Sequence, residues 1–61
     1  MKYKVGQEVR LIDNNRMPAL ESGEVVVIKK TDDCQFDGMI YFIANEIGMA
    51  YWVKESEITT K

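Results

Sequence analysis

The sequence predicts an all-β fold, a small barrel of four to five antiparallel strands with one short 3-10 turn near the C-terminus. Three stretches indicate it. Residues 25–28 are consecutive β-branched residues, which disfavour helix and favour strand. Residues 8–11 alternate between polar and apolar, the period of a half-buried strand. Residues 50–58 read as a strand, a tight polar turn and one isolated apolar residue, Ile58, that returns to the core.

The first strand lies around residues 8–11. Val9 and Leu11 share one face and Glu8 and Arg10 share the other, because successive side chains of a strand point to opposite sides of the sheet. The aspartate and two asparagines that follow Ile12 end the strand, since their side chains hydrogen-bond to local backbone.

The segment from Asp13 to Gly23 has no sustained period, and Pro18 excludes a central strand within it. It is too long for a hairpin turn, so we expect a long loop. Two of its apolar residues, Met17 and Leu20, either fold back and cap the barrel or form part of a binding surface. Long loops on small rigid scaffolds often carry recognition.

Two apolar strands and a closing hairpin follow. Residues 24–30 and 39–44 are apolar on both faces, as expected for strands that are covered on both sides. Residues 45–48 form the hairpin connection, in which Gly48 can adopt a positive φ. Residues 50–53 then return antiparallel as the next strand.

The length of 61 residues allows a single domain, residues 1–61. An apolar fraction of 46% suffices for one core, whereas 30% charged residues are too many for a membrane span. The N-terminus lacks the apolar core of a signal peptide. We therefore expect a cytoplasmic protein that does not bind membranes.

The residue types argue against catalysis and metal binding. The chain contains no histidine, the commonest general base and metal ligand, and the single cysteine, Cys34, cannot supply a zinc site or an internal disulfide. Adjacent carboxylates such as Asp32 and Asp33, or Glu55 and Glu57, are expected to be solvated in polar turns. We expect no enzyme activity, no cofactor and no metal.

The order of features resembles that of small bacterial and phage SH3-like barrels. Residues 3–11, YKVGQEVRL, resemble the x-V-G-x-x-V-R-L/V opening of these proteins, and residues 23–28, GEVVVI, resemble their G-x-V-x-x-I second strand. Tyr41 and Ile43, then residues 52–58, WVKESEI, resemble their Y-x-V and W-V-x-E-x-x-I/L ending. The resemblance, which extends to KOW-type modules, covers nearly the whole chain and implies an SH3-like barrel.

The resemblance also assigns faces to the strands. It implies a core of Val9, Leu11, Val25, Ile28, Tyr41, Ile43, Val53 and Ile58. Phe42 and Trp52 then lie together on the outer face, unless a β-bulge shifts the register or the 13–23 loop covers them. An exposed aromatic pair is a typical mark of an interaction site on a small soluble protein.

The first functional hypothesis is a non-catalytic protein-binding module. Its apolar and aromatic surface would comprise Trp52, Phe42, Tyr51, Met17, Leu20 and Phe36. The last of these lies in the 31–38 connection, where it either anchors the loop inward or stands exposed. A protein partner or a second copy of the chain would cover the surface. A phage-encoded inhibitor or modulator of a host or defence protein fits this description.

The alternative is a nucleic-acid-binding barrel, as the KOW resemblance allows. The basic residues that would contact the backbone are Lys2, Lys4, Arg10, Arg16, Lys29 and Lys30, and Tyr3 could stack on bases. The net charge of −2 and the interspersed Glu8, Glu21 and Glu24 argue against it.

Overall fold

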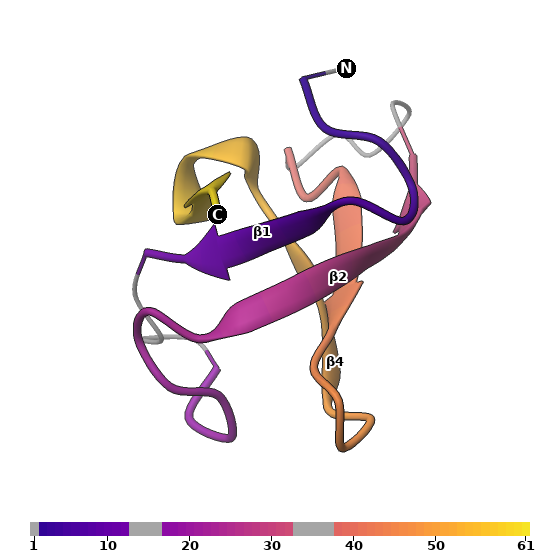
Figure 1. Cartoon of the computed structure of the whole chain (residues 1–61). Helices are drawn as coiled ribbons and strands as arrows, with labels where there is room; N and C mark the ends of the chain where they lie inside the picture. The colour runs from indigo at the N-terminus through magenta and orange to yellow at the C-terminus, as the bar shows by residue number, and fades with distance from the viewer. Residues whose placement is uncertain (1, 13–16, 33–37) are drawn as a thin grey trace.

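The computed structural model describes residues 2–12, 17–32 and 38–61, and in these it is all-β (Figure 1). It contains five strands and one 3-10 turn: β1 (Glu8–Leu11), β2 (Val25–Thr31), β3 (Tyr41–Ala44), β4 (Ala50–Val53), η1 (Glu55–Glu57) and β5 (Ile58–Thr60). The prediction of four to five strands with a 3-10 turn near the C-terminus is confirmed. Within the described ranges, no helix is both long and apolar enough to cross a membrane.

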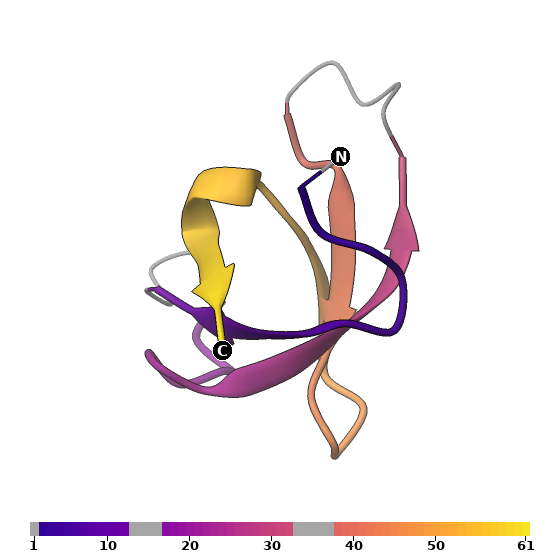
Figure 2. The ribbon, with the colours of Figure 1, turned by 45° about the horizontal axis from the view of Figure 1, so that its top comes forward.

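The strands form one antiparallel sheet in the order β4-β3-β2-β1-β5. The sheet curls strongly, so that η1 and β5 face β3 and β4 across the core (Figure 2). The turn η1 carries the chain from β4, at one end of the sheet, to β5 at the other, where Ile58 pairs with Leu11. This is the barrel architecture that the sequence predicts.

The core is formed by the inward faces of all five strands, by one residue before β1 and by two residues between β1 and β2. Its members are Tyr3, Val9, Leu11, Met17, Leu20, Val26, Ile28, Tyr41, Ile43, Val53 and Ile58. All the core residues implied by the resemblance are buried except Val25.

The prediction for Val25 is wrong because of the two-residue period of a strand. Val25 and Ile28 are three residues apart, so a regular strand cannot place both on one face. In β2, Val26 and Ile28 point inward and are buried, whereas Val25 and Val27 point outward and stay partly exposed. The expectation that both faces of this strand are covered is therefore also wrong.

The described part of the long loop, residues 17–23, packs against the core. Met17 is 0% exposed and Leu20 is 1% exposed, which confirms that they cap the barrel and removes them from the predicted binding surface. They contribute to the same cluster as Ile43 and Val53, on the side of the sheet opposite to Phe42 and Trp52. Met17 and Leu20 therefore do not cover the outer face, and residues 13–16 of the predicted loop lie outside the described residues.

Candidate protein-binding surface

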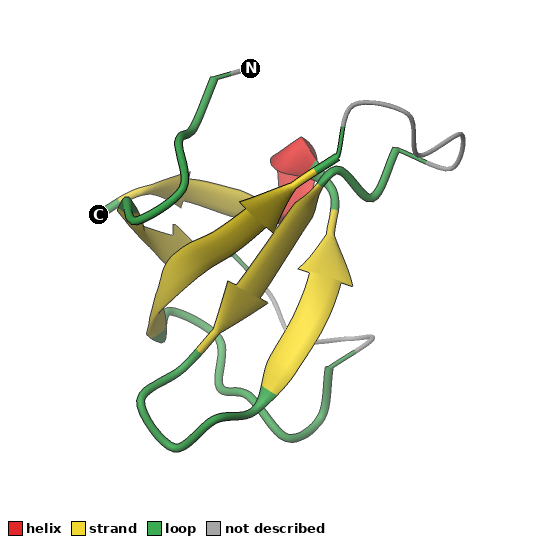
Figure 3. Cartoon of the chain, turned by 90° about the vertical axis from the view of Figure 1, so that its right-hand side faces the viewer, coloured by secondary structure: helices red, strands yellow, loops and turns green. Residues whose placement is uncertain are grey.

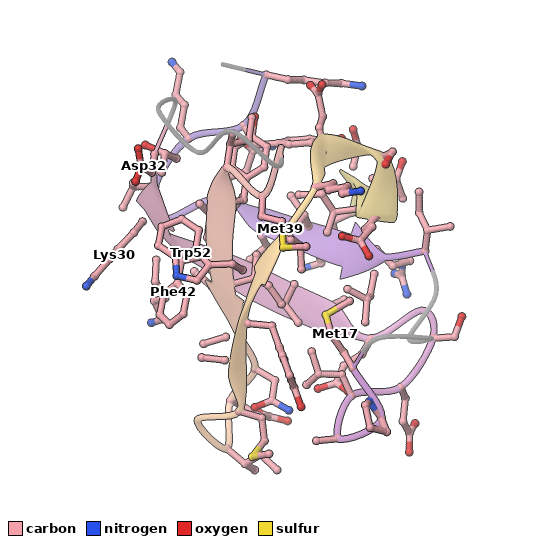
Figure 4. All side chains as sticks on the ribbon, turned by 180° about the vertical axis from the view of Figure 1, so that it is seen from behind. Met17, Lys30, Asp32, Met39, Phe42 and Trp52 are labelled. Carbon is pink, nitrogen blue, oxygen red and sulfur yellow. The ribbon has the colours of Figure 1, made fainter. Side chains whose placement is uncertain are left out.

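The outer face of β3 and β4 carries the aromatic pair that the sequence predicts. Phe42 and Trp52 lie directly opposite each other in the register, with ring centroids 5.1 Å apart and ring planes tilted by 45° (Figure 4). Both side chains are partly exposed, whereas the next residue, Val53, is fully buried. No bulge interrupts the β3–β4 pairing, so the predicted outward orientation of Trp52 is confirmed.

The hairpin register explains why the two rings touch. Asn45 N–H donates to the carbonyl oxygen of Met49 over 3.0 Å, so these two residues form a hydrogen-bonded pair of the ladder. Hydrogen-bonded and non-hydrogen-bonded pairs alternate in an antiparallel ladder. Counting from this pair makes Phe42 and Trp52 a non-hydrogen-bonded pair, the type in which opposing side chains approach most closely.

A β-bulge in β2 brings a cation to the aromatic pair. The register passes from Ile28 opposite Ile43 to Lys30 opposite Phe42, which makes Lys29 the extra residue. Lys30 consequently shares the outer face, and its Nζ lies 5.8 Å from the centroid of the Phe42 ring. This distance allows a cation–π contact. Lys30, Phe42 and Trp52 form one row across three strands (Figure 4).

Beside this row the outer face is hollowed, with a volume of about 530 Å³. Val27 and Ala44 are opposite each other in the floor, and Ala44 is one outward position along β3 from Phe42. The hollow is lined by Glu8, Glu24, Val25, Val27, Lys29, Ala44, Asn45, Glu46 and Lys61. We call the hollow together with Lys30, Phe42 and Trp52 the outer-face site.

The rim of the hollow carries charges of both signs. Lys61 Nζ lies 3.1 Å from Glu8 Oε1, and both side chains are about half exposed. The carboxylate of Glu24 is hydrogen-bonded to Asn45, whose Nδ2 donates to Glu24 Oε2 over 2.8 Å. Lys29 and Glu46 also line the rim and are exposed. An apolar floor inside a mixed rim suits the docking of an amphipathic protein surface.

Asn45 organises the hairpin that carries Trp52. Its Oδ1 accepts hydrogen bonds from Ile47 N–H (3.2 Å) and Met49 N–H (2.9 Å), while its Nδ2 ties the hairpin to Glu24 at the start of β2. Gly48 completes the turn with φ of +91°, a conformation that L-residues rarely adopt. Figure 3 shows this hairpin as a loop that projects from the sheet. These bonds keep the β3–β4 register in place.

The other predicted site residues fall in different places. Tyr51 shares the inward face with Val53 and packs partly against the core, so it does not join the outer-face row. Phe36 and Arg16 lie outside the described residues.

Of the predicted basic residues, only Lys29 and Lys30 belong to the outer-face site. Lys2 and Lys4 precede β1, and Arg10 donates to the carbonyl oxygen of Gly23 over 2.7 Å. Of the five predicted basic residues that the structure describes, three therefore lie outside the outer-face site.

Tyr3 is a core residue, so the expectation that it stacks on bases is wrong. It is 3% exposed, its N–H donates to the hydroxyl oxygen of Tyr41 over 3.1 Å, and the two rings meet edge to face with centroids 5.5 Å apart. Lys2 lies over its ring, with Nζ 5.5 Å from the centroid. The N-terminal segment thus closes the barrel.

Sequence reasoning missed Val27, Ala44 and Asn45 as parts of the site. Adjacent residues of a strand point to opposite faces, so an inward Ile28 would have placed Val27 outward, and an inward Ile43 would have placed Ala44 outward. No sequence signal marks the bulge that brings Lys30 to Phe42.

Comparisons of the chain with protein-family models, curated proteins and solved structures gave no match. In the described ranges, no group of three or more His, Cys, Asp or Glu side chains is placed to hold a metal ion. The fold and the outer-face site therefore define the class of protein: a small β-barrel domain with an aromatic surface on its outer sheet face.

Proposed function

We propose that this protein is a small non-catalytic binding module that recognises a partner protein through the outer-face site. The observation that carries the proposal is the contacting Phe42–Trp52 pair, which stays partly exposed on the outer face of β3 and β4. A chain of 61 residues has little apolar surface to bury, so leaving its single tryptophan half-buried costs stability. A partner protein that covers Trp52 would complete the burial of this side chain.

The chemistry of the site suggests the chemistry of the partner. An apolar or aromatic side chain of the partner would pack on Phe42 and Trp52, the residue types that dominate binding energy at interfaces. Lys30 lies beside the pair and Lys29 lines the adjacent hollow, and both favour an acidic group on the partner near β2. The narrower proposal, a phage-encoded inhibitor or modulator of a host or defence protein, rests on the family resemblance alone.

One observation favours the nucleic-acid alternative. The bulge sets Lys30 over the ring of Phe42, which with Trp52 forms a partly exposed aromatic pair. Aromatic rings with neighbouring cations form stacking platforms for single-stranded nucleic acids. Glu8, Glu24 and Glu46 around the adjacent hollow oppose it, because they repel phosphates. We therefore favour a protein partner.

The test is a Trp52→Ala variant with Ile47→Ala as its matched control. Ile47 is 77% exposed at the hairpin tip, outside the outer-face site, so both variants remove an exposed apolar side chain. Proteins captured from a lysate by the wild type would be identified, purified and titrated. Trp52→Ala should weaken their binding by about 2 kcal/mol, roughly 30-fold in Kd, and Ile47→Ala should not.

Salt dependence separates the two candidate functions. If the protein binds a partner protein through an apolar interface, the affinity should hardly change with salt concentration, and an oligo(dT) strand should not bind tightly. If the protein binds nucleic acid, the affinity for oligo(dT) should fall steeply as salt concentration rises. Equal loss of partner binding in both variants, or tight oligo(dT) binding that Trp52→Ala abolishes, would contradict the protein-binding proposal.

A further inference from the structure

We draw no further inference here: the strongest candidate, the edge of β4 that pairs with no strand in the described part of the chain, carries nothing, because nothing in the structure shows what covers it.

Discussion

Replacing Tyr41 by phenylalanine tests how the N-terminal segment is held to the barrel. Tyr41 is 0% exposed, and its hydroxyl oxygen accepts the N–H of Tyr3 over 3.1 Å in a buried hydrogen bond. Tyr41→Phe removes only the hydroxyl group and keeps the ring that packs edge to face on Tyr3. The substitution leaves no cavity of appreciable size, so the measured loss reports on the hydrogen bond.

The expected loss of stability in Tyr41→Phe follows from the burial of the hydrogen-bond donor, the Tyr3 N–H. A buried N–H that loses its acceptor retains its desolvation penalty, which is about 1–3 kcal/mol. For a domain of this length, a loss of about 2 kcal/mol lowers the melting temperature by roughly 8–16 °C. Total stability of a small domain can be as low as about 5 kcal/mol, so the effect should be large.

Urea unfolding followed by circular dichroism measures the effect, with Tyr51→Phe as the matched control. Tyr51 is only partly buried and its hydroxyl group makes no hydrogen bond within the described residues, so its loss should change stability little. The Tyr3 amide should also lose its protection from hydrogen exchange in Tyr41→Phe. Coincident unfolding midpoints for Tyr41→Phe and the wild type would refute the reasoning.

Two further substitutions test the closing turn and the hairpin. Ile58 is 2% exposed where β5 meets β1, so Ile58→Ala should cost about 2–4 kcal/mol through the cavity it opens. Ile47→Ala should be nearly neutral in the same denaturant titration, and equal midpoints for the two variants would show that Ile58 is not a core residue. Asn45→Ala should cost about 1–3 kcal/mol, because it removes the acceptor of Ile47 and Met49 N–H and the donor to Glu24. Faster amide exchange confined to Ile47 and Met49 would confirm a local loosening of the hairpin, and unchanged exchange there would contradict it.

The strands could be predicted because their signals are local. The alternation of β1, the β-branched residues of β2 and the glycine of the β3–β4 turn each depend on a few neighbouring residues. The outward position of Trp52 followed from the same period, once Val53 was placed in the core. These predictions needed no knowledge of contacts between distant segments.

The errors have non-local or irregular causes. Val25 was misassigned because the family pattern pairs it with Ile28 across an odd separation, and an uninterrupted apolar run hides which face is buried. Met17 and Leu20 lie in a loop without a period, so only their contacts with the core reveal their burial. Lys30 reaches Phe42 through a bulge whose extra residue carries no distinctive side chain.

The most direct test of the central claim observes Trp52 itself, which is the only tryptophan of the chain. Fluorotryptophan incorporated at this position gives one fluorine NMR signal, whose solvent isotope shift reports exposure of the ring. In dilute free protein the signal should show a clear shift between H₂O and D₂O, and this shift should shrink when a captured partner saturates the protein. A signal without a solvent isotope shift in the dilute free protein, or one that a saturating partner leaves unchanged, would contradict the claim that the outer-face site binds the partner.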